Sequence, residues 1–255
     1  MTNVSLCIPA YRSAEFLPDL FERLRALEPK PAEILLLDDA SPDESATLIS
    51  NFAEQALPQL NLRLIRNESN TGTAAAYNRL AQEAQAEWVH ILDADDYPVE
   101  VDFYARVVTE LDPQRDLLVT SLDSNSRALR WGISVFGWIV PRQPRRWWPL
   151  LGSFATRSGV VYRRARLLAQ PFPDPAFPGS DILHLLRLRS DRNCVFVRRA
   201  HVFYRVHAAA SSSRERSYRE YRAGLAPFGW VTWFAHILDL RLRMLGQRIE
   251  RRSRD

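Results

Sequence analysis

The segment Val4-Ser5-Leu6-Cys7-Ile8-Pro9 decides the fold, because it is a short apolar run that passes directly into the polar stretch Ala10-Tyr11-Arg12. Three further runs share its length and character, and they lie at residues 33–37, 60–65 and 88–92. Segments with helical spacing separate them, at residues 16–27, 44–56 and 73–85. Such alternation is typical of βαβ units and predicts an α/β fold with a mostly parallel central sheet flanked by helices.

The alternation continues less regularly in the second half of the chain. Pro98 can open a helix at its first position, and the helical pattern then runs to Leu111. The later elements that we expect are strands at 116–121, 160–162 and 194–197 and a helix at 182–189. Sheets of this kind bind ligands beyond the carboxyl ends of their strands, so the residues that follow each strand are the candidate site residues.

Two segments depart from this pattern. Residues 124–149 are rich in Trp, Pro and Arg and show neither helical nor strand period, which predicts a long irregular insertion near the site. Residues 214–255 form a C-terminal extension in which apolar side chains share one helical stripe and arginines lie outside it. This pattern is typical of a basic helix in a membrane interface and equally typical of a helix that packs its stripe on the core.

The composition is that of an ordinary globular protein, since 46% of the 255 residues are hydrophobic and 25% are charged. Arginines crowd the second half, which suits an anionic partner such as a diphosphate, a lipid-linked phosphate or a phospholipid surface. The basic residues match no recognised nucleic-acid-binding module, so we expect no nucleic acid as a partner.

The two cysteines indicate a reducing compartment. Cys7 and Cys194 lie in separate apolar runs, with neither the spacing of a zinc site nor a framework of disulfide pairs. The N-terminus has no secretory signal pattern, and the longest apolar stretch, 224–237, is shorter than the roughly 18 residues of a membrane span. We therefore expect a cytoplasmic protein, either free or peripheral on the inner face of the membrane.

The stretch Asp93-Ala94-Asp95-Asp96 is the strongest candidate site. Three carboxylates within four residues repel one another unless a cation neutralises them. Oxygen ligands of this kind select hard ions, so the cluster predicts a Mn²⁺ or Mg²⁺ site that accepts phosphate oxygens as its remaining ligands. The alternative is that these acids form only a solvated turn or a helix cap.

A second acidic pair, Asp38 and Asp39, ends the run at residues 33–37. A carboxylate here can accept the imide N–H of uracil or thymine or contact ribose, although the same pattern also fits the acidic pocket of a phosphoacceptor domain. Ser41, followed by Pro42, predicts the cap of the next helix.

Residues 70–78 open another helix with small side chains on several faces. Small side chains allow a ligand or a neighbouring strand to approach the backbone, and the N-terminus of a helix favours a nearby anion. Tight packing of the helix on the sheet explains the alanines equally well.

Taken in order, these motifs resemble glycosyltransferase family 2, and the resemblance extends over most of residues 4–213. The motifs that carry it are Val4-Ser5-Leu6-Cys7-Ile8-Pro9-Ala10-Tyr11, Leu37-Asp38-Asp39-Ala40-Ser41-Pro42-Asp43, the spacing of Asn70, Gly72, Ala76 and Asn78, Leu92-Asp93-Ala94-Asp95-Asp96, Ser158-Gly159-Val160 with Tyr162-Arg163-Arg164, Phe177-Pro178-Gly179-Ser180-Asp181, and Tyr204-Arg205-Val206-His207 followed by Ser211. The resemblance implies the GT-A fold over 1–213, with a nucleotide-binding half at 1–97 and an acceptor and catalytic half at 98–213.

The resemblance also implies roles for single residues. Those that would bind the donor are Pro9, Ala10, Tyr11, Asp38, Asp39, Asn70, Gly72, Asn78, Asp93, Ala94, Asp95, Arg205 and His207. Those that would hold the metal are Asp93, Asp95, Asp96 and His207. The family inverts the configuration of the sugar, and Asp181 matches its catalytic base.

Two positions depart from the family pattern. Tyr77 stands where arginine is common, and Ser180 replaces the acid that usually precedes the base. Without the resemblance, Asp181 would be read as the cap of a helix beginning at Ile182, and His207 as an exposed loop histidine.

These features predict an inverting transfer of a sugar from a UDP- or dTDP-sugar to a carbohydrate or lipid-linked acceptor. Aromatic side chains stack on sugars, so Trp147 and Trp148, together with Ser180, are the candidate acceptor residues. The alternatives are a nucleotidyltransferase with a related fold and an inactive membrane-associated scaffold. The first normally has a Gly-rich, Lys-containing loop after its first strand, which residues 9–13 lack.

Overall fold

The computed structural model describes residues 2–56, 59–127, 129–130, 157–173, 184, 188 and 194–207. Its elements in chain order are β1 (Val4–Ala10), α1 (Leu17–Ala26), β2 (Glu33–Asp38), α2 (Ser45–Ala56), β3 (Leu62–Arg66), α3 (Thr73–Glu83), β4 (Trp88–Ile91), β5 (Tyr97–Pro98), α4 (Phe103–Val108), β6 (Leu117–Ser124), the 3₁₀ turn η3 (Arg157–Gly159), β7 (Val160–Arg163), α6 (Arg164–Ala169) and β8 (Cys194–Tyr204). The α/β class predicted from the sequence is confirmed.

The strands form one sheet in the order β3-β2-β1-β4-β7-β6-β8-β5. The first four are mutually parallel, and their register places Ala10 of β1 beside Asp38 of β2. Beyond β4 the sheet is mixed, because β7 runs antiparallel to both of its neighbours whereas β6 and β8 are parallel. The carboxyl ends of β1, β2 and β4 therefore meet at one edge.

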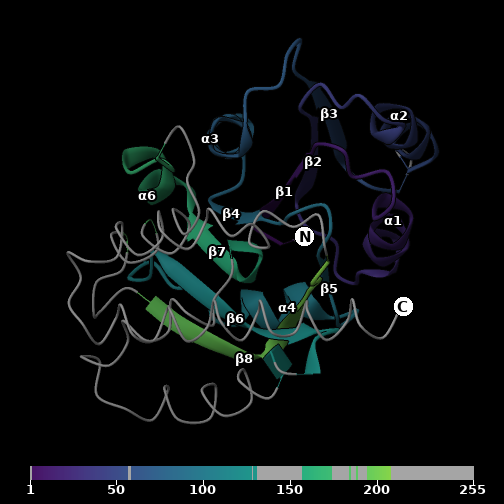
Figure 1. The fold of residues 1–255 in the computed structure, drawn as a ribbon. Helices are drawn as coiled ribbons and strands as arrows, with labels where there is room; N and C mark the ends of the chain where they lie inside the picture. Colours follow the sequence, from purple (N-terminus) through teal and green to yellow (C-terminus); the bar gives the residue numbers. More distant parts are fainter. Residues whose placement is uncertain are drawn as a thin grey trace.

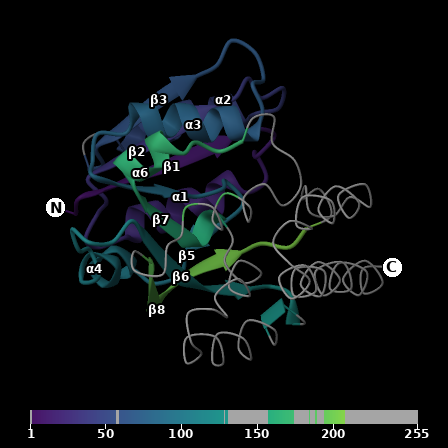
Figure 2. The same ribbon diagram turned by 90° about the vertical axis from the view of Figure 1, so that its left-hand side faces the viewer.

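Helices cover both faces of the sheet, as Figure 1 shows, with α1 and α2 on one side and α3 and α6 on the other. One buried cluster joins Leu6 of β1 to side chains of α1, α2 and α4, and the other joins Cys7 of β1 to side chains of α3 and α6. Seen from the side of α3 and α6, these two helices lie in front of the parallel strands (Figure 2). Because successive side chains of a strand point to opposite faces, β1, which is buried on both faces, needs both layers.

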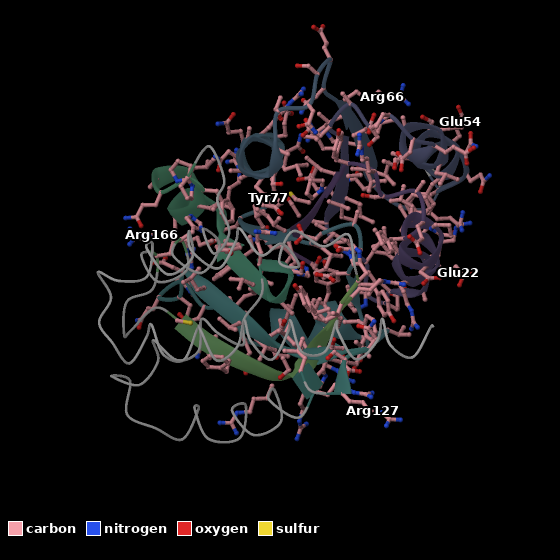
Figure 3. All side chains as sticks on the ribbon, in the orientation of Figure 1. Glu22, Glu54, Arg66, Tyr77, Arg127 and Arg166 are labelled. Atoms are coloured by element: carbon pink, nitrogen blue, oxygen red, sulfur yellow. The ribbon has the colours of Figure 1, made fainter. Side chains whose placement is uncertain are left out.

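Charged side chains lie on the outer surfaces of the helices. Figure 3 shows Glu22 on the outer side of α1 and Glu54 on the outer side of α2, whereas Tyr77 of α3 points into the molecule. Tyr77 is only 2% exposed although it stands in a helix with several alanines. The small residues of α3 thus let the helix lie close to the sheet, and a large aromatic ring fills part of the interface.

Three expectations from the sequence are wrong in detail. Pro98 lies in β5 and opens no helix, and α4 begins at Phe103. Ser41 does not cap α2, because Asp43 Oδ1 accepts the hydrogen bond from the N–H of Ser45, the first residue of that helix. The first residues of the segment at 124–149 are not irregular, since Ser124 ends β6 and the described residues 127 and 129–130 are helical.

Other expectations concern segments outside the described residues. These segments are most of the Trp-rich insertion at 124–149, most of the helix at 182–189 and the whole extension at 214–255. Neither Cys7 nor Cys194 forms a disulfide bond. In the part of the chain that the structure describes, every helix is too short or too polar to cross a bilayer.

Candidate active site

The acidic stretch at residues 93–96 lies directly after β4, at the edge where the parallel strands end. Ligand oxygens of Asp93, Asp95 and Asp96 lie within 4.8 Å of one another. The Asp96 N–H donates a hydrogen bond to the Asp93 carbonyl oxygen, so the backbone turns and directs the three carboxylates toward one point. Ala94, which lies between Asp93 and Asp95, is apolar and buried, so the polar side chains of this turn are those of the three acids.

Asp96 is the most buried of the three acids, at 1% exposure. Its Oδ1 accepts a hydrogen bond from the Arg205 N–H at 2.9 Å, but no described residue donates a hydrogen bond to its buried Oδ2. Burial, followed by the charges of Asp95 and Asp93, raises the pKa of Asp96 well above its ordinary value. A buried carboxylate oxygen without a partner is costly, and a cation beside it removes that cost.

The cluster therefore fits a divalent cation on the chemistry of its donors. The three carboxylates supply only oxygen ligands, as Mg²⁺ and Mn²⁺ prefer, and the unpartnered oxygen of Asp96 lies among them. Asp95 Oδ2 also lies 2.8 Å from His207 Nε2, so an imidazole contacts one acid of the cluster. Of the four residues predicted to hold a metal, the three aspartates are thus brought together, and the place of His207 among the ligands stays a prediction.

Residues that directly follow β8 contact the acidic turn. Arg205 donates from its backbone to Asp96 and from Nε to the Asp95 carbonyl oxygen, and its terminal nitrogen pairs with Asp19 of α1 at 2.9 Å. The His207 ring packs on Phe16, with the ring centroids 4.6 Å apart. The predicted pair of Arg205 and His207 is thus found at the site, but the guanidinium of Arg205 points to Asp19.

The second acidic pair lies at the carboxyl end of β2. Both residues are buried, and Asp38 Oδ1 accepts a hydrogen bond from the Ser41 N–H. Asp39 receives hydrogen bonds from the loop before α3: its Oδ1 from Asn67 and from the backbone and side chain of Thr71, and its Oδ2 from the Gly72 N–H. Asp39 therefore organises the loop that faces it across the strand ends.

The same loop contains two more of the predicted donor-binding residues. Asn70 Nδ2 donates to the carbonyl oxygen of Asp39 at 3.3 Å. Gly72 has a φ of +86°, a conformation that residues with a Cβ rarely adopt, and α3 begins directly after it. The loop and the N-terminus of α3 thus lie beside the carboxyl end of β2.

The end of β1 completes this edge. Pro9 and Ala10 belong to the strand, and Tyr11 follows it with 42% of its surface exposed. The guanidinium of Arg12 lies 5.4 Å from the centre of the Tyr11 ring. Tyr11 is thus an exposed aromatic surface near the two buried aspartates.

Both polar atoms of the Asn78 side chain form hydrogen bonds with the segment after α6. Its Nδ2 donates to the Phe172 carbonyl oxygen at 3.0 Å, and its Oδ1 accepts from the Phe172 N–H at 2.8 Å. The side chain thus ties α3 to the segment after α6. This use is structural, and its assignment to the donor remains a prediction.

The sequence did not reveal the contacts that hold Asp93. Its Oδ1 accepts a hydrogen bond from the Tyr77 hydroxyl at 2.6 Å, and its Oδ2 pairs with Arg157 at 2.9 Å. Tyr77 was noted only as a departure from the family pattern. Arg157 was missed because it stands 64 positions along the chain from Asp93, just before the motif Ser158-Gly159-Val160 and not within it.

A buried histidine supports this turn from within the sheet. His90 Nε2 lies 2.7 Å from the Ser158 carbonyl oxygen, and its Nδ1 lies 2.9 Å from the Tyr104 hydroxyl. A carbonyl oxygen only accepts, so Nε2 carries the proton of the neutral ring and Nδ1 accepts from Tyr104. The Ser158 hydroxyl in turn accepts from the Asp93 N–H, which links β4, α4 and η3 to the acidic turn.

The remaining predicted site residues lie outside the described residues. They are the catalytic candidate Asp181 and the acceptor candidates Trp147, Trp148 and Ser180. Their roles therefore stay predictions.

Comparison with known proteins places the described geometry in a family. The model described as Glycosyl transferase family 2 matches residues 5–167. The succinoglycan biosynthesis protein ExoO of Rhizobium meliloti (strain 1021) is 30% identical over 130 residues, which make up 49% of this chain and 36% of that protein. An undecaprenyl-phosphate 4-deoxy-4-formamido-L-arabinose transferase of Pectobacterium carotovorum subsp. carotovorum (strain PC1) is 38% identical over 96 residues, or 36% of this chain and 29% of that protein.

A solved structure shares the fold. The mannosyltransferase PcManGT from Pyrobaculum calidifontis, in complex with GDP-Man and Mn²⁺, matches with a TM-score of 0.70 and 17% identity over 96% of this chain and 74% of that chain. The predicted GT-A fold is confirmed by this likeness. The chain spans only about a third of the length of the curated relatives quoted above.

The paired hydrogen bonds of Asn78 predict a structural rather than a binding defect on mutation. Asn78→Ala removes both, and we expect the free energy of unfolding to fall by about 2 kcal/mol while affinity for a nucleoside diphosphate is unchanged. Chemical denaturation and calorimetry measure the two quantities. Asn61→Ala, which removes one exposed hydrogen bond to Ala32, is the control. A loss of nucleotide affinity at unchanged stability would contradict this prediction and support a donor-binding role for Asn78.

His90 predicts a dependence of stability on pH. Burial lowers its pKa to about 4, only partly offset by the hydrogen bond to Ser158, so the folded protein keeps it neutral where the unfolded chain protonates it. The free energy of unfolding should therefore fall by about 3 kcal/mol as the pH drops from about 6.5 to about 4 through this residue alone. Denaturant titrations across this range should show a shallower slope for His90→Gln than for the wild type, and equal slopes would refute the assignment.

Proposed function

The chain belongs to glycosyltransferase family 2, and on that premise we propose that it transfers a sugar from a nucleoside-diphosphate sugar to an acceptor hydroxyl with inversion. The observation that carries the proposal is the convergence of three carboxylates within 4.8 Å at the carboxyl edge of the parallel strands. The family match favours this reaction over nucleotidyl transfer. The intact acidic cluster argues against an inactive scaffold.

In this proposal the acidic turn holds the leaving group. The metal ion, Mn²⁺ or Mg²⁺, would be held by Asp93, Asp95, Asp96 and His207. It would act as a Lewis acid that stabilises the negative charge of the leaving diphosphate. Arg205 keeps the turn in place through the Asp96 carboxylate and the Asp95 carbonyl oxygen. Its contribution is to fix the geometry of the acids before the donor arrives.

The nucleoside is proposed to bind between the ends of β1 and β2. Tyr11 offers an exposed ring there, and the buried pair Asp38 and Asp39 offers carboxylate acceptors beside it. An acceptor at this place suits the imide N–H of uracil or thymine, so the proposed donors are UDP- or dTDP-sugars. Asp39 would serve this role while it also orders the loop at residues 67–72.

Transfer with inversion also needs a carboxylate that takes the proton of the acceptor hydroxyl on the face opposite the leaving group. By its match to the family motif, Asp181 is the proposed base. The acceptor is proposed to be a growing polysaccharide or a lipid-linked sugar, because the relatives include a succinoglycan biosynthesis protein and an undecaprenyl-phosphate transferase. Trp147, Trp148 and Ser180 are its proposed contacts, and the extension at 214–255 is the proposed membrane contact.

The metal-dependent binding of the donor can be measured with UDP alone. Mn²⁺ should strengthen the binding of UDP to the wild type, and Asp95→Asn should reduce this gain at least about tenfold because it removes a charged ligand. Isothermal titration calorimetry with UDP, in the presence and absence of Mn²⁺, measures the effect. Asp102→Asn replaces a surface carboxylate paired with Arg106 and serves as the control. Undiminished gain in Asp95→Asn would remove the metal from the proposal.

Replacing the proposed base should separate donor binding from proton transfer. Asp181→Asn should bind UDP and Mn²⁺ as the wild type does but lose transfer by a factor of about 10²–10⁴, the usual contribution of a general base. A transfer assay with the identified donor, with calorimetry as the binding control, checks it. Turnover at the wild-type rate would exclude Asp181 as the base.

A further inference from the structure

Asp93 differs from the other two acids of the cluster because side chains of this protein hold both of its carboxylate oxygens. Tyr77 of α3 donates to Oδ1, and Arg157 of η3 pairs with Oδ2. These residues come from elements that precede and follow β4 in the chain, so the contact depends on the folded sheet. Asp95 and Asp96, by comparison, have no ion pair with an arginine side chain among the described residues.

Tyr77 and Arg157 also contact each other. The centre of the guanidinium lies 4.4 Å from the centroid of the Tyr77 ring, within the range of a cation–π interaction. The ring is almost fully buried, whereas the side chain of Arg157 is 18% exposed. Tyr77 thus provides a fixed surface on which the planar guanidinium lies while it pairs with Asp93.

This arrangement places a positive charge inside the cluster that would receive a divalent cation. A guanidinium paired with Asp93 neutralises part of the negative charge and repels an incoming metal ion. The same guanidinium suits the oxygens of a diphosphate, which it can bind through two parallel hydrogen bonds. A metal ion alone thus competes with Arg157, but a metal ion together with a diphosphate gives Arg157 a new partner.

We propose that Arg157, positioned by the ring of Tyr77, is a resident cation of the acidic cluster that releases Asp93 and turns to the donor's diphosphate when metal and donor bind together. This inference rests on the proposed function. Its consequence is cooperative binding, in which metal alone binds weakly and each ligand strengthens the other by the same factor. Arg157 thus makes the site respond to the complete donor complex, and Tyr77 is the residue that positions it.

The test measures the affinity for Mn²⁺, by electron paramagnetic resonance of the free ion, with and without saturating UDP. In the wild type we expect UDP to tighten Mn²⁺ binding. In Arg157→Gln we expect Mn²⁺ alone to bind about three- to tenfold more tightly, because a repelling charge is gone, and the tightening by UDP to shrink. Arg157→Lys keeps the charge and should leave the affinity for Mn²⁺ alone close to that of the wild type.

Three further variants serve as a replacement test and as controls. Arg157→Met removes the charge but keeps a long side chain over the ring, and it tests the proposal if Arg157→Gln does not fold. Tyr77→Phe keeps the ring and the Arg157–Asp93 pair and removes only the hydrogen bond to Asp93 Oδ1, so it should change Mn²⁺ binding without UDP less than Arg157→Gln does. Arg115→Gln removes an arginine paired with Glu110 away from the cluster and should change neither affinity. Thermal unfolding of each variant separates a loss of folding from a change in the site.

The outcomes distinguish this proposal from the function on which it rests. If the wild type binds no Mn²⁺ even with UDP, the proposed metal-dependent function fails. If the wild type binds Mn²⁺ but Arg157→Gln, or Arg157→Met in its place, binds it with unchanged or weaker affinity in the absence of UDP, the function stands and the role of Arg157 is overturned.

Discussion

The mutual repulsion of three carboxylates in the turn after β4 is the constraint on which the rest of the site depends. Asp93, Asp95 and Asp96 lie so close together that their charges need compensation. The protein supplies part of it through the guanidinium of Arg157 at Asp93, while the imidazole of His207 contacts Asp95. Asp96 accepts a hydrogen bond from the backbone N–H of Arg205, and no described residue donates a hydrogen bond to its buried Oδ2. A cation that joins these acids would complete the compensation.

The sheet explains how distant segments reach this turn. Its parallel half brings the ends of β1, β2 and β4 to one edge, and β8 enters from the mixed half to place Arg205 and His207 beside the acids. His90 fixes η3 through the Ser158 carbonyl oxygen, and Ser158 then accepts from the N–H of Asp93. The position of the acidic turn is therefore set by the buried core as well as by the residues around the site.

Much of this architecture could be predicted from the sequence, for physical reasons that differ between elements. The strands β1–β4 were predicted because they are short, mostly apolar runs between segments of helical period, and the acids of the site were predicted because they follow those strands. The two-residue β5 and the six-residue α6 are too short to show a period. The partners of Asp93 could not be predicted, because a pair such as Tyr77 and Arg157 meets only through the packing of α3 and η3 on the sheet. The same holds for Asp39, whose donors at residues 67–72 lie beyond α2 and β3 in the chain.

The turn at residues 93–96 is proposed to bind a divalent cation that contacts the nucleoside diphosphate. Anomalous diffraction at the manganese absorption edge, from crystals grown with Mn²⁺ and UDP, tests this directly. We expect one strong anomalous peak among the carboxylates of Asp93, Asp95 and Asp96, in contact with an oxygen of the diphosphate. UDP bound at the strand ends without an anomalous peak at these carboxylates would contradict it.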